Sequence, residues 1–95
     1  MNISEMPALI DKEAVAGLHF PPEEVLSSKD LIVRRTNELD KAGMLGNMDH
    51  VKVKIIFEDS EGLKQIETTV WAVTKEAVVL KRGMTIPIRR IHEIR

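Results

Sequence analysis

The stretch Val70–Arg95, VWAVTKEAVVLKRGMTIPIRRIHEIR, alternates apolar with polar side chains in short runs that two breaks separate. The breaks are Thr74–Glu76 and Arg82–Gly83, whose residues are typical of tight turns. An alternation with a period of two places the apolar side chains on one face of a β-strand. The stretch therefore predicts short antiparallel strands, with Pro87 at a strand end because proline donates no ladder hydrogen bond.

The same period of two begins at Val51, and the turn residues Asp59–Gly62 separate a first strand from a second. In the second strand Val70 lies on the inner face, so strand alternation sends Trp71 and Val73 to the outer face. A large apolar side chain on an outer face is unfavourable in water unless something covers it. The pattern therefore predicts a contact at Trp71.

A single turn of 3₁₀ helix is predicted within Ile88–Ile94, because isoleucines recur there every three residues before a last short strand. The inward side chains of all the strands form one predicted core, which consists of Val53, Ile55, Phe57, Ile66, Val70, Val78, Leu80, Ile86, Ile88, Ile91 and Ile94. The sequence thus predicts a mainly β fold, with five strands in a meander that curls into a small barrel.

The first half of the chain has helical rather than strand periodicity. Residues 28–43 form the main predicted helix, which Ser27 or Ser28 can cap and which Gly43 or Gly46 can end in a left-handed conformation. Its predicted stripe contains Leu31, Ile32, Arg35, Leu39 and Ala42. Residues 28–95 are therefore predicted to be a single helix-plus-barrel domain.

Residues 1–27 are predicted to be an N-terminal arm or a short helix. Met6, Leu9, Ile10 and Ala14 are three and four residues apart, as on one helical face, and Gly17 can end the helix.

Composition restricts the class of protein. The chain has 95 residues, which suits one domain, and it contains no cysteine, so it forms no disulfide and has no thiolate nucleophile. No apolar run approaches the length of a membrane span, and a cytoplasmic location is expected. The net charge of −1 combines a balance of −4 in residues 1–50 with +3 in residues 51–95. The acidic half is expected to pack beside the basic half, or the basic half forms a binding face.

A helix followed by a five-stranded antiparallel meander resembles the SH3-like and Sm-like barrels, and VVLKRGMTIPI is similar to the Sm motif that contains arginine and glycine. The match is out of frame, because Arg82–Gly83 precedes the predicted fourth strand and the Sm motif precedes the fifth. The RNA-contacting residues of Sm proteins therefore do not transfer to this chain.

The segment Leu45–Ile94 also resembles a group of small uncharacterised bacterial proteins, on the pieces LGN, ETTVWAVT and IPI. This resemblance covers about half the chain. It implies a fold and a bacterial origin but no activity.

Catalytic and metal sites are not predicted. His19, His50 and His92 are 31 and 42 residues apart, and none has a second ligand at the spacing that metal sites use. The serines lie in cap or turn contexts, and the glycines do not form a phosphate-binding loop. We expect no catalytic residue, no cofactor, no metal and no small-molecule substrate, and hence no enzyme.

Two functions remain from different classes. The first is a protein-interaction module that forms a homodimer, because a barrel of about 45 residues is too small to bury a full core alone. Its candidate interface comprises Trp71, Val73, Leu31, Ile32 and Leu39. Either the chain's own helix lays its leucines and isoleucine over Trp71, or a second copy covers it.

The second function is RNA or single-stranded nucleic-acid binding by a basic barrel face. The candidate cations are Lys52, Lys54, Lys81, Arg82, Arg89 and Arg90. Single-strand binders stack bases on exposed rings, and only Trp71 is predicted to lie outside the core. The interaction module is therefore the preferred prediction.

Overall fold

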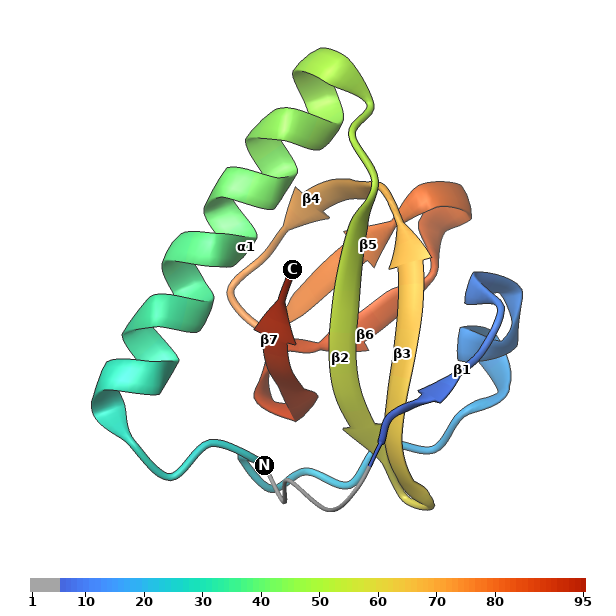
Figure 1. The fold of residues 1–95 in the computed structure, drawn as a ribbon, viewed down its shortest axis with the longest axis vertical. Helices are drawn as coiled ribbons and strands as arrows, with labels where there is room; N and C mark the ends of the chain where they lie inside the picture. The colour runs from blue at the N-terminus through green and yellow to red at the C-terminus, as the bar shows by residue number, and fades with distance from the viewer. Residues whose placement is uncertain (1–5) are drawn as a thin grey trace.

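The computed structural model describes residues 6–95, in which one long helix lies against two small sheets (Figure 1). The strands are β1 (Ala8–Leu9), β2 (Val53–Asp59), β3 (Gly62–Thr68), β4 (Val70–Val73), β5 (Ala77–Leu80), β6 (Thr85–Pro87) and β7 (Ile91–Ile94). The helices are α1 (Lys29–Asp49) and the 3₁₀ helices η1 (Lys12–Gly17), η2 (Lys81–Gly83) and η3 (Ile88–Arg90). The prediction of a mainly β chain with an α-helix ahead of the strands of its second half is confirmed. Residues 1–5 of the predicted arm lie outside the described residues.

The strands of residues 6–95 form a four-stranded sheet in the order β1-β3-β2-β7 and a three-stranded sheet in the order β4-β5-β6. Thr69 alone separates β3 from β4, so the chain passes from one sheet to the other at this residue. Neither sheet closes on itself. The predicted five-stranded barrel is therefore not confirmed, because the break at Thr69 and the predicted 3₁₀ step η3 interrupt the ladder.

The core agrees closely with the prediction. Every predicted core residue is buried except Ile88, which is partly buried and packs against the core. Alternation missed Ile56, which is as fully buried as Ile55 although it lies on the opposite face of β2. The other buried apolar residues outside the predicted core are Val15, Leu39, Ala42 and Leu63. The alternation of the strands thus identified the inner face of the sheets. The helix α1 and the N-terminal segment contribute the remaining residues of the core.

Helix α1 extends to Asp49, six residues past the predicted end. The predicted cap at Ser28 is confirmed, since its side chain accepts a hydrogen bond from the Leu31 N–H at 3.4 Å. The prediction that a glycine ends the helix was wrong. Gly43 and Gly46 lie buried within α1, and His50 takes the left-handed cap with φ of 54°.

Gly46 is needed for packing rather than for capping. A Cβ on Gly46 would lie 2.2 Å from the carbonyl oxygen of Val70 in β4, which is much closer than atoms can approach. A glycine here lets the backbone of α1 approach the backbone of β4. Figure 1 shows α1 lying along β4 and β7.

The predicted helical face from Met6 to Ala14 does not form, although a short 3₁₀ helix, η1, ends at Gly17. Ala8 and Leu9 instead form β1, which pairs in parallel with Lys64 and Gln65 of β3. The chain then turns through η1, which places Val15 in the core. A long-range strand partner decides the conformation of this segment, and local helical spacing does not reveal such a partner.

The predicted turns are confirmed. At the β2–β3 hairpin the Asp59 carboxylate accepts hydrogen bonds from the N–H groups of Glu61 and Gly62, at 2.9 and 3.1 Å. At the β5–β6 connection Arg82 and Gly83 both have positive φ, of 71° and 81°. A left-handed arginine is unusual, and the following glycine carries the second left-handed position without steric cost.

Candidate functional site

The most distinctive surface feature lies around Trp71 on β4, whose side chain is 46% exposed. A hollow of about 690 Å³ opens beside it, between the end of α1 and the strands β4 and β5. We call it the Trp71 hollow. Its lining residues are Gly46, Asn47, His50, Lys52, Thr69, Trp71, Ala72, Val79 and Lys81.

Helix α1 holds the backbone at Trp71 in place. The Asn47 side-chain amide donates to the carbonyl oxygen of Gly43 at 2.8 Å and to that of Trp71 at 3.1 Å. Together with the close approach at Gly46, this bridge fixes β4 against the helix. The indole is therefore presented from a rigid strand rather than from a loop.

The Trp71 hollow is cationic. Lys52 and Lys81 are exposed, His50 is the C-cap residue of α1, and none of the lining residues is acidic. The Lys81 N–H donates to the Thr69 carbonyl oxygen at 3.2 Å, which ties the start of η2 to the segment between β3 and β4.

The structure does not assemble the predicted interface residues around Trp71. Ile32, Leu39 and Val73 line a different groove, of about 490 Å³, between α1, the β4–β5 turn and η3. We call it the α1–η3 groove. Leu31 is 45% exposed and lines a third hollow near the start of α1. Of the two alternatives for covering the indole, the chain's own helix does not do so, because Trp71 is half exposed and Leu39 packs in the core.

The predicted basic residues do not gather on one face. Lys52 and Lys81 line the Trp71 hollow, whereas Lys54, Arg82 and Arg89 each line a separate hollow. Arg90 was wrongly predicted to be a surface cation, since it is 5% exposed. Its guanidinium donates to the carbonyl oxygens of Glu58 and Glu23, at 3.0 and 2.9 Å. A side chain that satisfies buried backbone acceptors has a structural role.

The sequence pattern did not predict a second buried cation, Arg35, which binds the segment that precedes α1. Arg35 of α1 is 3% exposed and binds both carboxylate oxygens of Glu24, at 2.6 and 2.7 Å. It also donates to the carbonyl oxygen of Ile91 in β7 at 3.0 Å. The position of Arg35 on an apolar helical stripe was the signal that could have revealed it, because a cation on such a stripe needs a buried partner.

Burial by itself raises the pKa of Glu24, but hydrogen bonds from Arg35 and from backbone N–H groups outweigh it and lower the pKa below its ordinary value of 4.5. The pKa of Asp59 is lowered in the same way, against burial, by Lys64 and by the N–H groups of its turn. A lowered folded-state pKa contributes stability above the ordinary pKa, and this stability is lost as the pH falls through the folded value.

We therefore expect the free energy of unfolding to fall as the pH drops below about 5, and to fall less in Glu24→Gln. At pH 7 this variant should lose about 1–3 kcal/mol, since Arg35 is buried but the Glu24 side chain is 29% exposed. Urea unfolding at several pH values measures both effects. Glu13→Gln is the matched control, because its pair with Arg82 spans 3.9 Å between exposed side chains. Identical acid profiles for wild type and Glu24→Gln would contradict this role.

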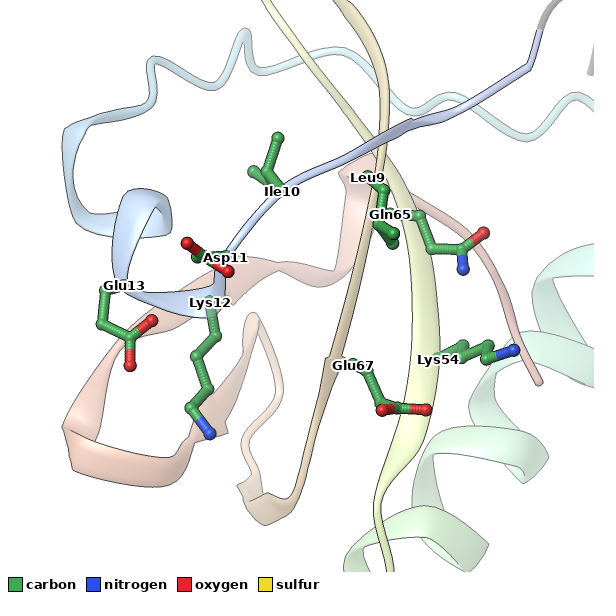
Figure 2. A pocket seen from close by; sticks show the side chains of 8 residues that line it. All are labelled: Leu9, Ile10, Asp11, Lys12, Glu13, Lys54, Gln65 and Glu67. Carbon is green, nitrogen blue, oxygen red and sulfur yellow. The ribbon is translucent and has the colours of Figure 1, made fainter.

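Figure 2 shows another hollow, of about 560 Å³, which lies beside β1. We call it the β1 hollow. Lys12 and Glu13 project from η1 on one side, and Lys54 and Glu67 extend from β2 and β3 on the other. With Asp11 it has three carboxylates and two lysines, so its charges largely offset one another. It does not select a ligand by charge.

Within residues 6–95, no three histidine or acidic side chains come together as a metal site. No helix in this range is long and apolar enough to cross a membrane. Comparisons with protein-family models, curated proteins and solved structures find no match to this chain, and they lend no support to the predicted kinship with small bacterial proteins.

Proposed function

We propose that this protein is a non-enzymatic interaction module that forms a homodimer through the outer face of α1. The observation that carries the proposal is the exposure of Val33, Met44 and Met48, at 59%, 62% and 73%. At about 100° per residue these positions lie within roughly 60° of one another, on the side of α1 opposite the buried stripe. Large exposed apolar side chains that share one face of a helix are typical of an interaction surface.

The proposed surface differs from the predicted one. It follows α1 from Val33 towards Met44 and Met48, and it does not depend on Leu39, which the core already holds. Methionine side chains are flexible and polarisable, so they adapt to a second copy of the same surface. A two-fold dimer is the expected assembly, because it brings identical patches together and then closes.

We also propose that the strands are a variant of the SH3-like or Sm-like barrel. In this interpretation β3 and β4 are the two halves of one strand that bends at Thr69, and η3 is the 3₁₀ step before the last strand. The strand orders support it, since β7-β2-β3 and β4-β5-β6 follow one another through that bend.

Wild-type protein should sediment as a dimer at tens of micromolar, and the double variant Met44→Glu/Met48→Glu should sediment as a monomer. Placing like charges on both copies of an apolar contact opposes association, whereas the charges are fully solvated in the monomer. Sedimentation velocity over a concentration series is the measurement. Leu9→Glu is the control, because Leu9 is 76% exposed on β1, which lies away from α1 (Figure 1). A wild-type monomer, or a dimer that survives in the double variant, would rule out this surface.

Iodide quenching of Trp71 in the same samples tests the alternative contact surface. If the dimer covers the indole, quenching should weaken as the dimer forms. If quenching is free in the dimer, Trp71 lies outside the contact.

A further inference from the structure

We propose that the Trp71 hollow is a binding site for a nucleotide, whose flat base stacks on the indole and whose phosphate lies against Lys52 and Lys81. This site does not depend on the self-association proposed above, which uses the outer face of α1. The ligand is defined by its chemistry, an aromatic base that carries a phosphate. It can come from a free mononucleotide or from a single strand of nucleic acid.

Trp71 supplies the stacking surface. Trp71 is 46% exposed and lines the hollow, so part of the indole is accessible to a ligand there. Stacking of a base on an exposed aromatic side chain is a recurrent and sequence-tolerant contact. The Asn47 bridge holds the backbone of Trp71 before any ligand arrives, which reduces the entropy lost on binding.

Lys52 and Lys81 supply the complementary charge. Both line the hollow, and within residues 6–95 neither of them forms an ion pair with a carboxylate. The β1 hollow, by contrast, contains three acidic side chains, and the α1–η3 groove contains Asp40 and Glu76. An anion therefore meets unopposed positive charge in the Trp71 hollow, and mixed charge in the other two.

The size and composition of the hollow fit one nucleotide rather than a duplex. Its volume of about 690 Å³ lies within the range of small-molecule sites, roughly 300–1,000 Å³. A duplex hides the faces of its bases, so a stacking site needs an unpaired base. The amide N–H groups of Asn47 are both used in the bridge to Gly43 and Trp71, so the indole and the two lysines are the groups that the hollow offers to a ligand.

The sole tryptophan of the chain is Trp71, so intrinsic fluorescence reports on this hollow alone. We would titrate the wild-type protein with a uridylate dodecamer, with uridine monophosphate, and with a glutamate peptide of matched charge. We expect saturable quenching by the dodecamer at low salt. For two phosphates on a single strand, the logarithm of the affinity should fall against the logarithm of salt with a slope of about −1.4.

To identify the contacting residues, we would measure the affinity of each variant for a labelled dodecamer by fluorescence anisotropy. Trp71→Ala should weaken binding by about 5- to 150-fold, the effect expected from the loss of one base stack. Lys52→Ala and Lys81→Ala should each reduce the magnitude of the salt slope by about 0.7. Lys54→Ala and Arg89→Ala are matched controls outside the hollow and should change neither value. Thermal melting of each variant confirms that it is folded.

Quenching by the monophosphate with similar affinity would identify a free nucleotide as the ligand, and quenching by the dodecamer alone would identify a single strand. Both outcomes support the site. Three outcomes would overturn it: no quenching by either ligand at low salt, equal quenching by the glutamate peptide, or undiminished dodecamer binding in folded Trp71→Ala. None of these results bears on the sedimentation test, so the two proposals fail separately.

Discussion

Replacing Gly46 with alanine is expected to lower the free energy of unfolding by about 3 kcal/mol or more. The new Cβ would lie 2.2 Å from the Val70 carbonyl oxygen, and backbone on either side must move to accommodate it. Helix propensity acts in the opposite direction, since alanine favours a helix over glycine by about 1 kcal/mol. The sign of the change therefore shows whether tertiary packing or local propensity dominates at this position.

Gly43→Ala is the matched control for this variant. It lies three residues earlier in the same helix, and its Cβ would meet Val73 at 3.5 Å, an ordinary contact distance. This variant should be as stable as wild type or up to about 1 kcal/mol more stable. Urea unfolding followed by circular dichroism compares the two. If Gly46→Ala were as stable as Gly43→Ala, α1 would not approach β4 as closely as the structure shows.

Truncation of Leu80 or Val70 to alanine should cost about 2–5 kcal/mol. Both side chains are fully buried, and they face each other in the β4–β5 ladder. A small domain has a total stability of about 5–15 kcal/mol, so such a loss removes much of it. Thermal and urea unfolding measure the change. Leu9→Ala is the control, because its side chain is 76% exposed, and wild-type-like melting of Leu80→Ala or Val70→Ala would contradict this core.

The double variant Val70→Ala/Leu80→Ala extends this test. Neighbouring truncations share a cavity, so their costs should not add. Simple additivity would mean that the two side chains do not form one packing unit.

The sequence predicted the strands well because their information is local. Alternation alone assigned Ile55, Phe57 and Val70 to the inner face, and each is fully buried. Turn chemistry placed the connections at Asp59–Gly62 and Arg82–Gly83. Strand alternation and turn conformation both depend on a residue and its neighbours in the chain, so a single sequence is enough to predict them.

The wrong predictions concern residues whose conformation or burial depends on contacts with residues far away in the sequence. Gly46 looked like a helix end, but its absent side chain makes room for Val70. Met6, Leu9 and Ile10 had helical spacing, but β3 offers Ala8–Leu9 a strand partner. Arg90 looked like a surface cation, but backbone carbonyls from two other segments surround its guanidinium. Spacing in the sequence does not identify such partners.

The candidate site was only partly predictable for the same reason. The sequence correctly set Trp71 apart as an outward aromatic side chain. The convergence of Lys52 and Lys81 on it depends on how β4 and β5 meet the end of α1, which no local pattern encodes.

The four-stranded sheet has its two outer strands at opposite ends of the described chain, and this arrangement bears on the rate of folding. β7 joins β2 through the pairing of Ile55 with Ile94, and β1 joins β3 through the pairing of Ala8 with Lys64. Each pairing closes a long loop, whose entropy is lost before the contact is gained. Helix α1 and the β2–β3 hairpin need only nearby residues and can form first. We therefore expect the edges of the sheet to pair late in folding, and until they pair, both flanks of the β2–β3 hairpin expose unpaired backbone to other unfolded chains.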